Sequence, residues 1–106
     1  MHKIVRKSEA IVRQIASNKT VSNLITKEIS PAASFAVTNA SEYHEKEITP
    51  YDRIYFVLDG ELKLTFDSQT YTLYKGDSCF IGKGTQYEMR GTFEVAVVNQ
   101  PAFGAY

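Results

Sequence analysis

An arginine among aromatic residues is the first feature of this sequence that could bind a ligand. Residues 51–60 read YDRIYFVLDG, and this aromatic and β-branched run predicts a strand that ends at an Asp59-Gly60 turn. Alternation places Arg53 and Tyr55 on one face of that strand, together with Tyr51. A guanidinium that points inward needs an acidic partner or an acidic ligand, because an unpaired buried charge is too costly. A carboxylate or a phosphate held by two hydrogen bonds is the simplest such ligand.

Residues for nucleophilic or thiolate chemistry are few. The chain has a single cysteine, Cys79, which excludes an internal disulfide and a zinc site with several thiolates. In its apolar strand, Cys79 is expected to be a small buried hydrophobe. The histidines are His2 and His44, and no Ser/His/Asp or Cys/His set is recognisable. Ligand binding is therefore the simplest use of the arginine.

The elements that must position Arg53 are strands. From residue 50 onward, short runs rich in β-branched and aromatic residues alternate with turn sequences, and this regular spacing favours a β-sandwich or barrel. In residues 51–58, Ile54, Phe56 and Leu58 lie on the face opposite Arg53. A strand that is apolar on one face and aromatic or polar on the other fits a wall between a packed core and a cavity.

The N-terminal third has a different pattern. The run SEAIVRQIAS, residues 8–17, places apolar residues on one helical face after Ser8, a plausible N-cap, and predicts a short amphipathic helix. Pro31 ends this region, and SFAVTNA then predicts a strand. We expect an arm or short helix over residues 1–30 that packs on a barrel formed by residues 31–106.

Length and charge limit the function classes. A chain of 106 residues forms one domain, and its charges sum to a net of zero with no Lys/Arg block. Nucleic acid and membrane surfaces are therefore not expected partners. No apolar run approaches the roughly 20 residues of a membrane span, and the first residues lack the core of a signal peptide. A cytoplasmic location is expected.

Two segments resemble the conserved motifs of the cupin superfamily. YFVLDGELKLTF is similar to the first motif, a strand that runs into V-L-x-G-E-L. GDSCFIGKGTQYE is similar to the second, and its spacing from Gly76 to Gly82, Gly84 and Tyr87 has no gap. The resemblance implies an all-β fold, the cupin double-stranded β-helix or jelly-roll barrel.

The metal ligands of typical cupins are replaced here. Metal-binding cupins carry a glutamate at the position of Arg53, a histidine at that of Tyr87, and two more histidines near Glu47 and Thr49. A permanent guanidinium charge would oppose a divalent cation in the same cavity. We therefore expect no metal and no cofactor. A shifted loop that brings His44 and Glu47 inward is the fallback for a metal site.

Within the cupins, the chain resembles the small cupins of ethanolamine-utilisation operons. The shared residues include Tyr51, Asp52 and Gly60 in the pattern Y-D-x-x-x-x-V-L-x-G, and the second motif also lacks the metal histidine. This resemblance implies a bacterial protein of a family associated with microcompartments. That family has an acidic residue at the position of Arg53. The acetate-kinase-like activity proposed for the family is therefore not carried over to this chain.

The same motif alignment turns Tyr87 and Met89 inward and places Glu47 near Arg53. The predicted ligand-binding residues are Glu47, Tyr51, Arg53, Tyr55, Tyr87 and Met89. The leading hypothesis is a metal-independent small cupin that binds a small anionic organic ligand, a carboxylate or phosphate, and is not an enzyme. The alternatives are an isomerase, epimerase or lyase, with or without metal, and a structural subunit with a filled barrel. The outward Ile54, Phe56 and Leu58 need cover, which predicts a homodimer.

Overall fold

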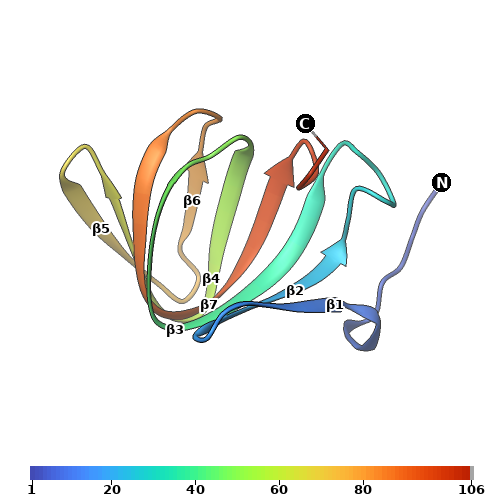
Figure 1. The fold of residues 1–106 in the computed structure, drawn as a ribbon, viewed down its shortest axis with the longest axis horizontal. Helices are drawn as coiled ribbons and strands as arrows, with labels where there is room; N and C mark the ends of the chain where they lie inside the picture. Colours follow the sequence, from blue (N-terminus) through green and yellow to red (C-terminus); the bar gives the residue numbers. More distant parts are fainter. Residues whose placement is uncertain (106) are drawn as a thin grey trace.

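The computed structural model describes residues 1–105, and these form one antiparallel β-sheet that rolls up on itself (Figure 1). The strand order is β1-β2-β3-β7-β4-β5. Strand β5 pairs with residues 61–66 of β4, and β6 pairs with residues 53–56 of the same strand. The all-β fold predicted from the sequence is confirmed. The elements are the 3₁₀ turn Lys7–Glu9 and the strands β1 Ile11–Ala16, β2 Lys19–Ile25, β3 Ser34–Ile48, β4 Asp52–Phe66, β5 Gln69–Tyr74, β6 Ser78–Ile81 and β7 Gln86–Gln100.

The amphipathic helix predicted for residues 8–17 is wrong. Most of that segment is β1, which forms a hairpin with β2, and β2 pairs in turn with β3. The helical pattern misled because Ile11, Val12 and Ile15 are β-branched residues that also suit a strand, and all three side chains remain exposed. Pairing with β3 decides between the two conformations, as tertiary context often does for short segments.

The turn predicted at Asp59-Gly60 is also wrong, because β4 runs through this position without a break. Val57 pairs with Val95 and Asp59 with Glu94, so Leu58 is an extra residue, a β-bulge. Gly60 follows this bulge with φ +79°, and a Cβ there would lie 2.3 Å from the backbone oxygen of Thr92. The glycine thus serves a bend where two strands approach closely.

Gly60→Ala should destabilise the protein by about 2 kcal/mol, from the cost of positive φ together with the clash against β7. Gly84→Ala is the matched control, since Gly84 has φ +87° but a Cβ there would meet nothing within 4 Å. The control should lose about 1 kcal/mol, the cost of the backbone conformation alone. Urea denaturation of both variants measures the difference, and equal losses would contradict the close approach.

The core lies inside the rolled sheet, in the part built by β4, β5 and β7. Leu62, Leu64 and Val95 are completely buried there, and Phe66 stacks on Tyr87 with ring centroids 6.0 Å apart. This part of the barrel is therefore filled by side chains. No helix among residues 1–105 has the length and apolar composition needed to cross a membrane.

An apolar row crosses the outside of the sheet. Phe35 pairs with Val98, Val98 with Ile54, and Ile54 with Phe80, so four neighbouring strands contribute to it. Ile54 and Phe80 are 42% and 65% exposed. We call this row, together with Phe56, the outer face. Its exposed aromatic and aliphatic side chains form a continuous apolar surface.

Candidate functional site

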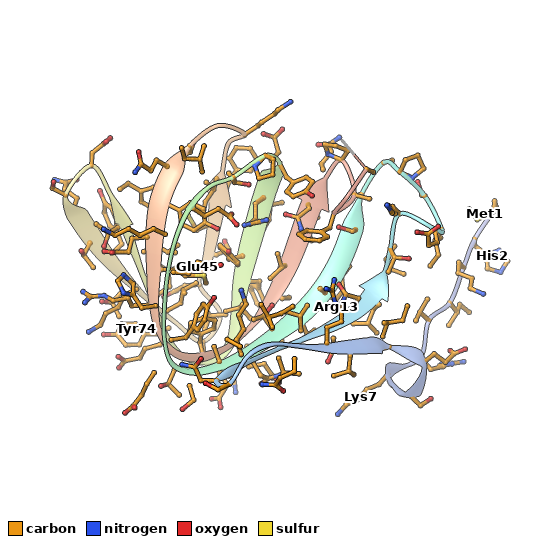
Figure 2. The ribbon with its side chains drawn as sticks, viewed as in Figure 1. Met1, His2, Lys7, Arg13, Glu45 and Tyr74 are labelled. Carbon is orange, nitrogen blue, oxygen red and sulfur yellow. The ribbon has the colours of Figure 1, made fainter. Side chains whose placement is uncertain are left out.

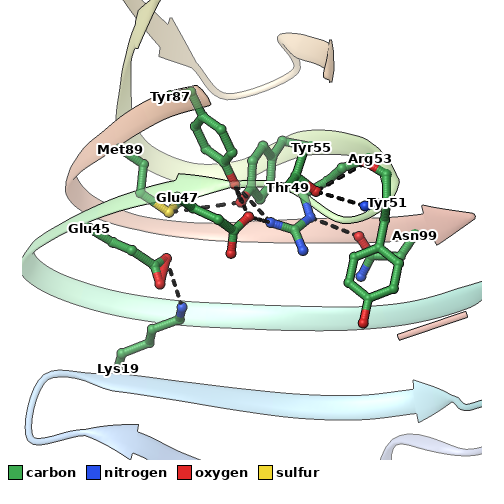
Figure 3. Close-up of polar contacts among 10 residues, drawn as sticks. All are labelled: Lys19, Glu45, Glu47, Thr49, Tyr51, Arg53, Tyr55, Tyr87, Met89 and Asn99. Carbon is green, nitrogen blue, oxygen red and sulfur yellow. Dashed lines mark hydrogen bonds and ion pairs between the residues drawn. The ribbon is translucent and has the colours of Figure 1, made fainter. Parts of the chain in front are cut away.

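Arg53 points into the barrel, where it is only 6% exposed. Its Nε donates a 2.7 Å hydrogen bond to Oδ1 of Asn99. Its Nη1 donates to Glu47 Oε1 and, over 2.8 Å, to the hydroxyl oxygen of Tyr87. Figure 3 shows the guanidinium between Glu47 and Asn99. Three strands thus fix one cation: β4 supplies Arg53, β3 supplies Glu47, and β7 supplies Tyr87 and Asn99.

The surroundings keep Arg53 charged and its tyrosine neighbours neutral. Burial alone would lower the pKa of Arg53, but the neighbouring Tyr55, Tyr87 and Glu47 raise it above its ordinary value. Burial raises the pKa of Tyr55 and that of Tyr87. The two hydroxyls lie 2.8 Å apart, and Tyr87 also donates to Glu47 Oε1 over 3.0 Å. A cation, a carboxylate and two phenols therefore form one hydrogen-bonded network.

A cavity of about 230 Å³ lies beside this network, between it and the β1–β2 hairpin. It is smaller than the roughly 300–1,000 Å³ of sites for drug-sized ligands, so it suits a smaller molecule. Apolar and polar side chains both line it. The lining residues are Arg13, Ile15, Lys19, Val21, Asn23, Ser34, Ala36, Thr38, Glu45, Glu47, Arg53, Tyr55, Met89, Val97, Asn99 and Phe103.

Among residues 1–105, one of the charged side chains that line the cavity makes no ion pair. Arg53 pairs with Glu47, and Lys19 pairs with Glu45 at 3.4 Å. Arg13 also lines the cavity, and its side chain extends from β1 toward the interior of the rolled sheet (Figure 2). Within residues 1–105 Arg13 makes no ion pair. The charged side chains of residues 1–105 that line the cavity therefore sum to +1, and the extra charge is that of Arg13, which is exposed to solvent.

Of the six side chains predicted for the site, four line the cavity: Glu47, Arg53, Tyr55 and Met89. Tyr87 lies behind Arg53 and contacts it by the hydrogen bond described above. Tyr51 is also behind Arg53, with its ring centroid 5.7 Å from the guanidinium carbon. The Tyr51 hydroxyl accepts a 2.7 Å hydrogen bond from the backbone N–H of Gly104.

The structure does not bring His44 and Glu47 together. They lie on opposite faces of β3, and His44 Nε2 is 2.6 Å from Glu88 Oε2 on the outside of the barrel. The hydrogen bond from His44 lowers the pKa of Glu88. No three His, Cys, Asp or Glu side chains among residues 1–105 are placed to hold a metal ion. The residues that converge here, with a guanidinium at their centre, do not fit a divalent cation.

Sequence reasoning missed Asn99, Arg13 and the Lys19–Glu45 pair. Asn99 had a signal: it ends the inward row Phe93, Val95, Val97, Asn99, where an amide interrupts buried apolar residues. No such signal marked the other two: Arg13 was assigned to the predicted helix, and Lys19 to the arm expected over residues 1–30. The hairpin that carries them forms one wall of the cavity.

A rolled antiparallel barrel with an inward-facing polar site is the architecture of a cupin, and comparison with known proteins confirms this class. The family described as the cupin domain of mannose-6-phosphate isomerase matches residues 31–100, more than half of the chain. The protein therefore belongs to the cupin-domain family of mannose-6-phosphate isomerase. None of the curated proteins matches the sequence significantly.

Several solved structures share the fold. An ethanolamine utilization protein Q from Salmonella typhimurium superposes with a TM-score of 0.74 at 24% identity, covering 79% of this chain and 70% of that one. An RmlC-like cupin from Shewanella frigidimarina has a TM-score of 0.84 at 13% identity, with 98% and 95% covered. The Streptomyces nucleoside dehydratase Pac13 has a TM-score of 0.80 at 14% identity, with 98% and 86% covered. At such identities the likeness shows the fold.

Proposed function

We propose that the protein binds a small organic monoanion in the barrel cavity. The observation that carries this proposal is the fixed guanidinium of Arg53, which Asn99, Glu47 and Tyr87 hold against the cavity wall. Donors that are already oriented lose little conformational entropy when a ligand binds. The net charge of +1 around the cavity favours a ligand with one negative charge. Glu47, Tyr55 and Met89 would contact the same ligand, while Tyr51 and Tyr87 would position Arg53.

Calorimetric titration with pentanoate and with its methyl ester tests this function on the unmodified protein at neutral pH. The two probes differ little in shape, but the ester lacks the negative charge. We expect the acid to bind about tenfold more tightly or better, because a hydrogen bond to a charged group contributes about 1.5–3 kcal/mol. Equal affinities, or no binding of either probe, would contradict an anion site.

An isomerase, epimerase or lyase is the second candidate, and one observation favours it. The hydroxyl of Tyr55 contacts that of Tyr87, and Tyr87 donates to Glu47, so a chain of exchangeable protons ends at a cavity carboxylate. The raised pKa values of both tyrosines keep them protonated, which disfavours them as general bases. Glu47 is then the group that could accept a proton. A purely structural subunit is disfavoured by the cavity, because its barrel would be filled.

We also propose that two copies of the chain pair through the outer face. Exposed Ile54, Phe56 and Phe80 lie on neighbouring strands of a continuous sheet surface, and two such faces can pack on each other about a symmetry axis. Ile54→Glu should convert a dimer into a monomer in light scattering coupled to gel filtration. Tyr74→Glu, also at an exposed position but on β5, is the control and should leave the mass unchanged. A wild-type monomer would contradict the proposal.

A further inference from the structure

The polar wall of the cavity has a specific order of donors and acceptors. Arg53 has five N–H donors: Nε donates to Asn99, and Nη1 donates to Glu47 and Tyr87. This leaves both N–H groups of Nη2, which have no hydrogen-bond partner within residues 1–105. Since Arg53 lines the cavity, Nη2 presents two donors to a molecule inside it.

The two neighbours of Arg53 have one unused group each. Asn99 must turn Oδ1 toward Arg53, because Nε can only donate, so its Nδ2 amide donors point away from the guanidinium. Glu47 uses Oε1 for both of its hydrogen bonds, which leaves Oε2 as an acceptor. Neither Nδ2 nor Oε2 is a fully buried atom without a partner, since the described residues include no such atom. Both residues line the cavity, so both groups are open to it.

The polar groups of this wall therefore follow the order donor, donor, acceptor, which are Asn99 Nδ2, Arg53 Nη2 and Glu47 Oε2 (Figure 3). The complementary ligand carries two acceptors followed by a donor. A carboxylate with a hydroxyl group on the adjacent carbon has this order: its two oxygens accept from Asn99 and Arg53, and its hydroxyl donates to Glu47. A plain carboxylate would leave the Glu47 acceptor without a partner, which costs affinity.

The charge and the shape of the cavity narrow the class of ligand further. A 2-amino acid has the same order of groups, but it is a zwitterion and brings no net negative charge to a cavity whose charged lining residues sum to +1. A 2-hydroxy acid has one negative charge and matches the net +1 of the cavity. The opposite wall includes Ile15, Val21 and Ala36, which suit a short carbon chain.

We propose that the site is selective for 2-hydroxycarboxylates, recognised by Asn99 and Arg53 through the carboxylate and by Glu47 through the hydroxyl. This inference rests on the proposed function of the same cavity and adds the substrate class. Glu47 is the residue that sets the preference, because it supplies the acceptor of the wall.

Calorimetric titration of the full chain with five acids of equal length tests the proposal: pentanoate, 2-hydroxypentanoate, 3-hydroxypentanoate, 2-oxopentanoate and 2-aminopentanoate. One or both enantiomers of the 2-hydroxy acid should bind about tenfold more tightly than each of the other four. If several acids bind with equal affinity, the selectivity is wrong but the anion site stands. If none of the five binds, both proposals fail.

Glu47→Gln sharpens the test, because the amide oxygen of Gln must face the Arg53 donors and its Nε2 then replaces the Oε2 acceptor with a donor. The variant should therefore lose the preference for 2-hydroxypentanoate over 2-oxopentanoate, because the hydroxyl oxygen and the keto oxygen can both accept from the new donor. Glu45→Gln is the matched control, because it removes the same charge from the same cavity without touching the array. It should keep the wild-type order. Loss of the preference in the control, or an undiminished preference in Glu47→Gln, would overturn the role of Glu47.

Discussion

Replacing Arg53 with methionine should weaken the binding of a small carboxylate by about 100-fold or more. Methionine fills similar space with a flexible apolar chain, but it removes the charge and both Nη2 donors that face the cavity. Loss of one or two charge-assisted hydrogen bonds, each contributing about 1.5–3 kcal/mol, accounts for a factor of this size. Calorimetry with the carboxylate that binds the wild-type protein most tightly measures the effect.

Two further variants separate the geometry of Arg53 from its charge. Arg53→Lys keeps a cation but replaces the planar fork by a single ammonium, so it should lose an intermediate amount of affinity. Lys83→Gln removes a cation from an exposed turn that does not line the cavity, and it should bind like wild type. Undiminished affinity in a folded Arg53→Met protein, verified by its thermal transition, would exclude Arg53 as the anchor.

Removing the carboxylate of Glu47 should be the most costly of the substitutions for stability. Glu47→Ala leaves the guanidinium of Arg53, which is 6% exposed, without its acidic partner. Breaking a buried pair in this way costs about 3–5 kcal/mol, and we expect about 3 kcal/mol because Glu47 is itself partly exposed. Urea denaturation measures the change in the free energy of unfolding.

A double-mutant cycle shows whether the cost comes from the stranded charge. In an Arg53→Met background no charge remains to be left unpaired, so Glu47→Ala should then cost about 1 kcal/mol or less. Glu45→Ala provides a comparison within the same strand, since the Glu45 side chain is 28% exposed, as is that of Glu47. Its partner Lys19 can move its ammonium toward water, and the loss should be about 1 kcal/mol. Equal costs of Glu47→Ala in both backgrounds would contradict this account.

The C-terminal half of the fold could be predicted from the sequence, because its strands have a clear alternating pattern. The strands between residues 51 and 100 alternate with period two, and the side of β4 that carries Arg53 and Tyr55 follows from that alternation alone. The resemblance to the cupin motifs then predicted that these strands form a jelly-roll barrel. Four of the six residues predicted for the site line the cavity, because all lie on the alternating inward rows of β3, β4 and β7.

What could not be predicted depended on tertiary contacts. Residues 8–17 fit a helical and an extended pattern equally well, and only the pairing of the hairpin with β3 selects the strand. Arg13 consequently could not be assigned to the cavity. An Asp-Gly pair is also locally the same sequence in a hairpin turn and after a bulge, and the partner strand β7 decides which of the two forms.

The extra residue Leu58 also divides β4 into two stretches of opposite phase. Before it, the inward residues have odd numbers, such as Arg53 and Tyr55, and after Gly60 they have even numbers, such as Leu62 and Leu64. Deleting one residue here would merge the two phases and turn one stretch inside out. The bulge therefore lets odd-numbered residues of β4 face the cavity and even-numbered residues face the core. The sequence of either stretch can vary without affecting the other, as long as the extra residue at position 58 is kept.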